Sequence, residues 1–226
     1  MSNITSIIMT AHIQEPMIAH MTMASIANIT RYTDPEDYEF ILVSNDEKFP
    51  VRDDYKVLKI DRYERVNNTT YNQAMNIGAK LAKGDYLCFI QNDVFVWEYW
   101  LNDLKEYILR NLADCVIPDQ VPRDRAFVKQ AQMMDYEEAM KYGSRDEGLM
   151  FMTREAYDQM KGFRDDLKIL QGKDTLERMA NAGVRQIDTC KVMISHIMAA
   201  TNLSLLHKDP KEYDERMKHD AAILNK

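Results

Sequence analysis

The chain has 226 residues and a formal net charge of −7 at pH 7, with 46% hydrophobic and 29% charged residues. This balance is typical of a globular protein with a sizeable core, so it excludes disordered and collagen-like chains, and the acidic charge disfavours proteins that coat nucleic acid. The sequence predicts no membrane-spanning helix and no signal peptide. Three widely spaced cysteines, Cys88, Cys115 and Cys190, favour reduced thiols in a cytoplasm.

The first half of the chain alternates short apolar runs with helical patterns. In chain order, the predicted elements are a strand over 6–10, a helix over 15–28, strands over 39–43 and 55–60, a helix over 72–82, a strand over 85–90 and a helix over 97–112. Strands that alternate with helices pair in parallel through helical crossovers, so the pattern predicts an α/β protein.

Polar residues directly follow three of the predicted strands. They are Thr10-Ala11-His12, Ser44-Asn45-Asp46 and Gln91-Asn92-Asp93. In sheets of this class, ligands bind beyond the carboxyl ends of the strands. One such group is usually only a turn former, but three groups on the same edge predict a ligand-binding site.

Asp93 is the candidate metal ligand of this edge. A carboxylate at the end of a buried strand can bind Mg²⁺ or Mn²⁺, which take one or two protein carboxylates together with phosphate oxygens and waters. Such an ion neutralises the charge that develops on a leaving diphosphate. The alternative is an aspartate that only closes a turn.

Several blocks of sequence surround this aspartate and continue through the second half of the chain. The first are Asn76-Ile77-Gly78, Ala82-Lys83-Gly84-Asp85-Tyr86 and Phe89-Ile90-Gln91-Asn92-Asp93-Val94, followed by Trp100-Leu101. The later ones are 148–157, Gly162-Phe163-Arg164, 174–183 and Ile194-Ser195-His196. In their order and spacing, the blocks resemble family 2 glycosyltransferases of the GT-A fold over residues 6–202.

The resemblance implies a GT-A fold, with a mixed, mostly parallel central sheet flanked by helices. It implies a single domain over residues 1–226, divided into a nucleotide-sugar-binding half (1–96), an acceptor half (97–200) and a C-terminal helical extension (201–226). The extension is consistent with a closing helix, a dimer contact or a helix on a membrane surface, and its balanced charges argue against the last.

The resemblance also implies roles for individual residues. The nucleotide-sugar would contact Thr10, Ala11, His12, Asn45, Asp46, Asn72, Asn76, Gln91 and Asn92. Asp93 and His196 would hold the metal cofactor, Mn²⁺ or Mg²⁺. Gln91 stands where the family has its first acidic residue, so the site has one negative charge fewer. The alternatives are a loop histidine at position 12, helix capping or a solvated face for Asn72 and Asn76, and a structural role for His196.

The family's general base is a carboxylate in a Glu-Asp pair, and this pair is not intact here. If Gly172-Lys173-Asp174 matches the family's Gly-Glu-Asp, Asp174 is the base that takes the proton of the acceptor hydroxyl. A different gap placement puts Gly172 at the base position and makes Asp174 a helix cap. Asp165 and Asp166 are the fallback candidates.

The implied activity is inverting, metal-dependent transfer of a hexosyl or pentosyl group from a UDP- or GDP-sugar to an acceptor hydroxyl. The expected acceptor is a saccharide or a lipid-linked sugar. An alternative is a hydroxylated base in DNA, as for phage DNA-modifying glycosyltransferases, bound by basic residues of the charged, irregular segment 118–147: Arg123, Arg125, Lys129, Lys141 and Arg145. A further alternative is a domain that binds a nucleotide without turnover, and a homodimer is the assembly if the C-terminal stretch forms a dimer contact.

Overall fold

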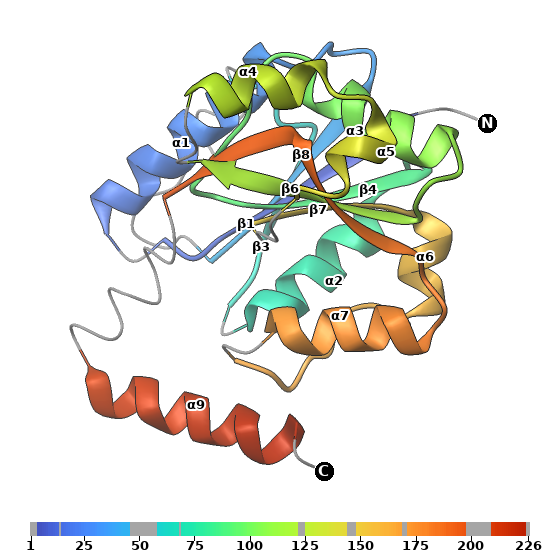
Figure 1. Cartoon of the computed structure of the whole chain (residues 1–226). Helices are drawn as coiled ribbons and strands as arrows, with labels where there is room; N and C mark the ends of the chain where they lie inside the picture. The colour runs from blue at the N-terminus through green and yellow to red at the C-terminus, as the bar shows by residue number, and fades with distance from the viewer. Residues whose placement is uncertain are drawn as a thin grey trace.

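The computed structural model describes residues 4–13, 15–45, 58–67, 69–121, 125–143, 148–168, 171–197 and 209–224 (Figure 1). The strands of these ranges are β1 (Thr5–Ala11), β2 (Tyr38–Ser44), β3 (Arg62–Arg65), β4 (Tyr86–Gln91), β5 (Val94–Phe95), β6 (Cys115–Val121), β7 (Leu149–Thr153) and β8 (Gln186–His196). The helices are α1 (Pro16–Arg31), α2 (Tyr71–Leu81), α3 (Trp100–Leu109), α4 (Arg125–Met133), α5 (Tyr136–Ala139), α6 (Arg154–Gln159), α7 (Gln171–Asn181) and α9 (Pro210–Leu224).

The strands form one mixed sheet in the order β3-β2-β1-β4-β7-β6-β8-β5. Neighbours from β3 to β4 run parallel, as do β6 and β8, whereas β7 runs antiparallel to β4 and β6, and β5 runs antiparallel to β8. The predicted α/β class with a mixed, mostly parallel sheet is therefore confirmed. As a consequence, β1, β2, β3, β4, β6 and β8 all end at the same edge of the sheet, which we name the carboxyl edge.

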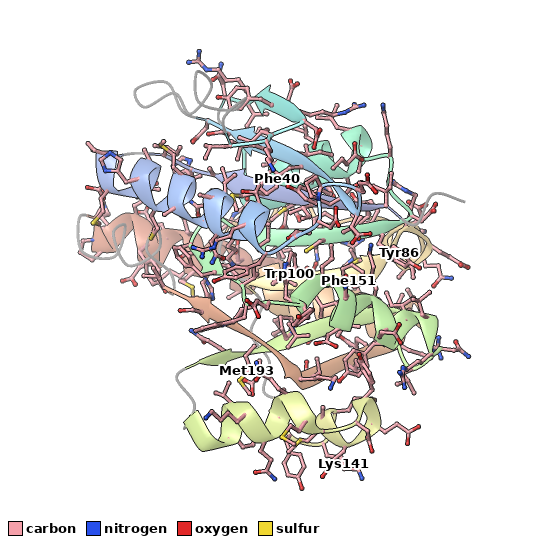
Figure 2. All side chains as sticks on the ribbon, turned by 90° about the horizontal axis from the view of Figure 1, so that it is seen from above. Phe40, Tyr86, Trp100, Lys141, Phe151 and Met193 are labelled. Atoms are coloured by element: carbon pink, nitrogen blue, oxygen red, sulfur yellow. The ribbon has the colours of Figure 1, made fainter. Side chains whose placement is uncertain are left out.

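Helices cover both faces of the sheet. Because successive side chains of a strand point to opposite faces, strands such as β1 and β2 contribute to two cores. Ile7 and Phe40 join a core with Trp100 of α3 on one face, and Figure 2 labels Phe40 and Trp100 there. Ile8 packs on the other face against residues of α2, α6 and α7, the helices that Figure 1 shows on that side. Each fully buried Ile or Phe contributes about 1.5–3 kcal/mol, so two such layers hold the strand ends in place.

Helix α2 packs close to the sheet and begins at the carboxyl edge, because it links β3 to the parallel β4. The Thr70 hydroxyl accepts a hydrogen bond from the Gln73 N–H at 3.2 Å, and the Gln73 side chain accepts one from the Thr70 N–H at 3.0 Å. This capping box fixes the start of the helix. A Cβ at Gly78 would lie 2.3 Å from Ile8 Cγ2, so the close approach of α2 to β1 requires a glycine there.

The third strand lies later in the sequence than predicted. The prediction of a strand over 55–60 is wrong for its described part, because the chain turns there and Lys59 has a φ of 55°. Residues 55–57 lie outside the described residues. The strand is instead Arg62–Arg65, whose polar composition suits an edge of the sheet. Ile60 is buried at the turn, which explains the apolar run that suggested a strand.

The segment 118–147 is more regular than predicted, because it contains the end of β6 and helices α4 and α5. Ala131 and Met134 pack with Cys190 and Met193 of β8. The sequence shows little sign of this small apolar cluster, because charged residues surround the apolar ones in the segment. The DNA-acceptor alternative depends in part on residues outside the described ranges, namely Arg123, Arg145 and the side chain of Arg125.

The described part of the C-terminal stretch contains the helix α9. Helix α3 starts at Trp100 rather than at residue 97, because Tyr99 has a left-handed φ of 64°. Among the helices of the described ranges, none has the length and apolar character needed to cross a membrane.

Candidate active site

The ends of β1, β2 and β4 lie side by side at the carboxyl edge. Thr10 in β1 is in register with Val43 in β2 and with Gln91 in β4. The polar residues that follow these strands therefore gather at one edge, as their order in the sequence predicts. Asp46, the last residue of the second polar group, lies outside the described residues.

The pairing of β5 with β8 brings Asp93 and His196 together. Val94 is in register with His196, and the Ile197 N–H donates to the Asp93 carbonyl at 3.1 Å. The His196 Nε2 lies 3.3 Å from Asp93 Oδ1 and 3.2 Å from Gln91 Oε1. The two predicted metal ligands are thus neighbours, with the Gln91 amide beside them.

The side chains of Asp93, His196 and Gln91, which form one corner of the carboxyl edge, suit a hard divalent cation. Asp93 is 3% exposed, and its Oδ1 accepts no aligned hydrogen bond from the described residues. A buried carboxylate oxygen in this condition is costly unless another group, such as a cation, satisfies it. No group of three or more His, Cys, Asp or Glu side chains that could hold a metal occurs within the described ranges. The remaining ligands of a Mg²⁺ or Mn²⁺ ion would come from phosphate and water.

His12 and Asn45 contact each other just beyond the ends of β1 and β2. The Asn45 Oδ1 accepts a hydrogen bond from the Ile13 N–H at 3.1 Å, and its Nδ2 contacts the His12 Nδ1. Desolvation and the charge of Arg216 lower the pKa of His12, so its imidazole is mainly neutral near pH 7. With Nδ1 accepting from the amide, Nε2 carries the proton and can donate to a ligand.

Three other predicted contacts are more enclosed. Thr10 and Ala11 are the last residues of β1 and are 7% and 4% exposed, so their side chains offer little surface. The Asn92 side chain donates to Thr22 Oγ1 of α1 at 2.8 Å. Asn92 therefore ties the turn after β4 to α1.

Asn72 and Asn76 hold the segment 163–168 against the start of α2. The Asn76 Nδ2 donates to the Phe163 carbonyl at 2.8 Å and to Asp165 Oδ1 at 2.6 Å. Asn72 is fully buried, and its Nδ2 donates to the Arg164 carbonyl at 2.6 Å. The Nδ2 groups of both amides are engaged within the protein, a role that the sequence interpretation missed, whereas the buried Asn72 Oδ1 accepts no hydrogen bond from the described residues. The signal was present, because the Asn76 and Gly162-Phe163-Arg164 blocks belong to the same resemblance.

Asp174 lies in the first turn of α7 and is only 4% exposed. Its Oδ1 lies 3.5 Å from Arg164 Nη1, and its Oδ2 lies 3.8 Å from Arg178 Nη1. Burial between two guanidinium groups fits the gap placement in which Asp174 stabilises the start of the helix and Gly172 stands at the base position. The role of Asp174 as general base stays a prediction.

Asp165 and Asp166, by contrast, are exposed. Asp165 is oriented by Asn76, and the Asp166 Oδ1 lies 2.7 Å from Arg164 Nε. Since α2 begins at the carboxyl edge and its asparagines bind this segment, both carboxylates lie at the same edge as Asp93.

Many solved structures resemble the chain in fold, among them the following three. The mannosyltransferase PcManGT from Pyrobaculum calidifontis, in complex with GDP-Man and Mn²⁺, has a TM-score of 0.71 and 16% identity over 98% of this chain and 64% of its own. GalNAc-T7 with UDP, GalNAc and Mn²⁺ has a TM-score of 0.66 and 15% identity over 85% of this chain and 43% of its own. S. aureus TarS has a TM-score of 0.62 and 14% identity over 98% of this chain and 43% of its own. The chain therefore spans less than two thirds of each of these proteins.

The family is shown by the sequence itself. No curated protein sequence matches the chain at a significant level. The family model described as Glycosyl transferase family 2 matches residues 6–168, which include Asp93 and Asp165 and end before Asp174 and His196. This match covers most of the chain, and the structural relatives have the GT-A fold. The chain belongs to glycosyl transferase family 2 and has the GT-A fold.

Proposed function

We propose that the protein is a metal-assisted glycosyltransferase that moves a sugar from a nucleotide-diphosphate sugar to an acceptor hydroxyl with inversion. The observation that carries the proposal is the buried carboxylate of Asp93 beside His196 at the carboxyl edge. Family membership supports it, and so do the ligands of two structural relatives, GDP-Man with Mn²⁺ and UDP with GalNAc and Mn²⁺.

Different residues of the carboxyl edge would bind the metal ion and the nucleotide of the donor. Asp93 and His196 would hold a Mn²⁺ or Mg²⁺ ion, with Gln91 beside them. When bound, such an ion supplies the positive charge that stabilises a departing diphosphate. His12 and Asn45 would bind the base or ribose of a UDP- or GDP-sugar, because they stand at the ends of β1 and β2, where parallel sheets bind nucleotides.

In the proposed reaction, the acceptor oxygen bonds to the anomeric carbon as the bond from that carbon to the diphosphate oxygen breaks. A protein carboxylate takes the acceptor proton, and the single displacement inverts the anomeric configuration. We assign the proton to Asp165 in preference to Asp174. Asp165 is exposed and its carboxylate is oriented by the Asn76 amide at 2.6 Å, whereas Asp174 is 4% exposed and lies between two arginines.

The acceptor in this proposal is the hydroxyl of a saccharide or of a lipid-linked sugar, and the transferred sugar is a hexose or a pentose. A hydroxylated DNA base is the alternative acceptor. Of the basic residues that would bind DNA, Lys129 and Lys141 are exposed in the structure. If these two lysines bind DNA, replacing both with alanine should lower the rate of sugar transfer to modified DNA.

A second candidate function is nucleotide binding without turnover. Gln91 in place of an acidic residue and the burial of Asp174 between arginines are the observations that favour it. A protein of this kind would bind UDP or GDP with Mn²⁺ but would release no product from the corresponding nucleotide sugars.

Release of UDP or GDP from nucleotide sugars in the presence of Mn²⁺ tests the proposal. We expect the unchanged protein to cleave at least one donor and Asp93→Asn to lower the rate by about 10²–10³-fold, the usual cost of losing transition-state charge stabilisation. Glu98→Gln, which alters an exposed carboxylate, is the matched control and should keep the full rate. Equal rates for the unchanged protein and Asp93→Asn would contradict the proposal, and binding without cleavage would favour the second candidate.

A further inference from the structure

Helix α9 is attached to the body of the protein through one of its faces. Asp220 is fully buried, and its Oδ1 and Oδ2 accept hydrogen bonds from the Lys168 N–H at 3.0 and 2.9 Å. The His219 Nε2 lies 3.1 Å from the Asp166 carbonyl oxygen. A buried carboxylate is costly unless it is hydrogen-bonded, so Asp220 acts as a clamp between α9 and the segment 163–168.

The segment that receives α9 lies at the candidate active site. Asn72 and Asn76 hold it against the start of α2, and Arg164 joins it to the first turn of α7. Both helices begin at the carboxyl edge, since each leads into a strand that runs toward that edge. Figure 1 shows α9 beyond the starts of α2 and α7, next to the loop between α6 and α7. Helix α9 therefore borders the place where the donor would bind.

Arg216 lies one helical turn before Asp220, on the same face of α9. Its Nε donates to Glu212 Oε1 at 3.1 Å, its Nη2 contacts the same oxygen, and its side chain is 39% exposed. Desolvation and, after it, the charge of Arg216 lower the pKa of His12 just beyond the end of β1. The face of α9 that Asp220 fixes against the segment 163–168 thus carries a cation on the side that borders the carboxyl edge.

We propose that α9 forms one wall of the donor site and that Arg216 binds the diphosphate of the nucleotide sugar. This inference rests on the proposed function. A guanidinium can offer two parallel N–H groups to phosphate oxygens. A diphosphate diester, one divalent ion and Asp93 together carry one net negative charge, because Gln91 and a neutral His196 add none. Arg216 would offset that charge by exchanging its ion pair with Glu212 for the phosphate oxygens.

The affinity for UDP and GDP in the presence of MnCl₂, measured by titration calorimetry, tests the role of Arg216. We expect Arg216→Ala to raise Kd about tenfold, the usual effect of losing a charge-assisted hydrogen bond. The thermal midpoint without nucleotide should stay the same, and Arg216→Lys should recover part of the affinity. Lys211→Ala removes another cation of α9, which is 86% exposed and pairs with Glu215, and it should leave Kd unchanged.

Asp220→Ala tests the clamp. If Asp220 holds Arg216 in place, this variant also raises Kd, and the double variant binds no more weakly than Arg216→Ala alone, because the arginine is already displaced. Additive losses in the double variant, or an unchanged Kd in Arg216→Ala, would overturn the inference.

Asp93→Asn separates this inference from the proposed function. Weaker binding by Asp93→Asn together with full affinity in Arg216→Ala would leave the proposed function standing and would remove α9 from the donor site. If the unchanged protein binds neither UDP nor GDP, both proposals are wrong.

Discussion

Two carboxylates near the carboxyl edge have opposite surroundings. Asp165 is exposed and is oriented by the Asn76 amide at 2.6 Å. Asp174 is 4% exposed and faces Arg164 and Arg178. A general base must come within hydrogen-bond distance of the hydroxyl that it deprotonates, which an exposed side chain can do. In the first turn of α7, Asp174 instead stabilises the positive end of the helix dipole.

Replacement of these two aspartates should therefore have different effects. We expect Asp165→Asn to lower kcat by about 10²–10⁴-fold with little change in the thermal midpoint. Asp174→Asn should lower the free energy of unfolding by about 1–3 kcal/mol, because two arginines lose a buried partner. Steady-state kinetics and urea unfolding measure the two quantities, with Asp158→Asn, an exposed carboxylate of α6, as the control. A normal kcat in Asp165→Asn with a lost kcat in folded Asp174→Asn would identify Asp174 as the base.

The residues of the site were predictable in part. The position of Asp93 after a buried strand and its place in the resemblance point to the corner that it forms with His196. The roles of Asn72 and Asn76 did not follow from residue type, because an amide shows no preference in the sequence for a ligand over a backbone carbonyl, and only the resemblance links Asn76 to the block Gly162-Phe163-Arg164. Which partner it binds depends on the loop that folds against the helix, here residues 163–165.

At the scale of elements, the distance between α2 and β1 controls where the carboxyl-edge asparagines stand. Gly78 lets the helix approach, since a Cβ would lie 2.3 Å from the Cγ2 of Ile8, which is fully buried. A β-branched side chain has little rotational freedom, so Ile8 cannot turn this methyl group away without a shift of the helix.

Gly78→Ala should lower the free energy of unfolding by about 1–3 kcal/mol, the usual cost of overpacking a core. This loss opposes the gain of about 1 kcal/mol that alanine brings to a helix interior. The comparison of Gly78→Ala with Lys80→Ala, an exposed position of the same helix, by urea unfolding measures the effect. In an Ile8→Ala background, Gly78→Ala should cost less than it does in the unchanged protein, because the opposing methyl group is gone. A Gly78→Ala protein at least as stable as the unchanged one would contradict the packing described here.

The starts of β6 and β8 are joined by Asp114 and Arg185. The Arg185 Nη2 lies 2.7 Å from Asp114 Oδ1, and its N–H and Nε donate to Asp114 Oδ2 at 2.9 Å. These hydrogen bonds lower the pKa of Asp114 in the folded state. The folded state therefore binds this proton less readily than the unfolded chain does.

The stabilisation from Asp114 is thus complete above the ordinary aspartate pKa of about 3.9, and it is lost as the pH falls through the lower folded-state pKa. We expect the urea midpoint of the unchanged protein to fall in this acidic range more steeply than that of Asp114→Asn. Parallel pH profiles for the two proteins would show that the pair contributes nothing.

At the scale of the whole molecule, the order of strands and helices up to β4 follows from the sequence, because parallel strands joined by helices have few arrangements. The reversed strand β7 and the short β5–β8 pairing do not follow from periodicity, since neither leaves a regular pattern in so few residues. The contact between Asp93 and His196 depends on that pairing, so only the resemblance indicated it. The attachment of α9 was not predictable either, because its contacts come from His219 and the buried Asp220 in a helix of mostly polar composition.

Ligand binding should stabilise the whole fold, because a ligand that binds only the folded state raises its apparent stability. At a concentration about 100 times Kd, UDP or GDP with Mn²⁺ should add about 2.7 kcal/mol. Differential scanning fluorimetry should show a higher thermal midpoint with nucleotide and Mn²⁺ together than with nucleotide and EDTA. Equal midpoints under these two conditions would argue against a metal that bridges protein and nucleotide.

Electron paramagnetic resonance of Mn²⁺ decides whether Asp93 holds a divalent cation against the nucleotide. In the presence of UDP or GDP, the unchanged protein should remove the signal of free Mn²⁺ in proportion to its sites, and Asp93→Asn should leave far more of that signal at the same concentrations. If Asp93→Asn removes as much free Mn²⁺ as the unchanged protein does, the carboxylate is not the metal ligand, and the proposed mechanism loses its basis.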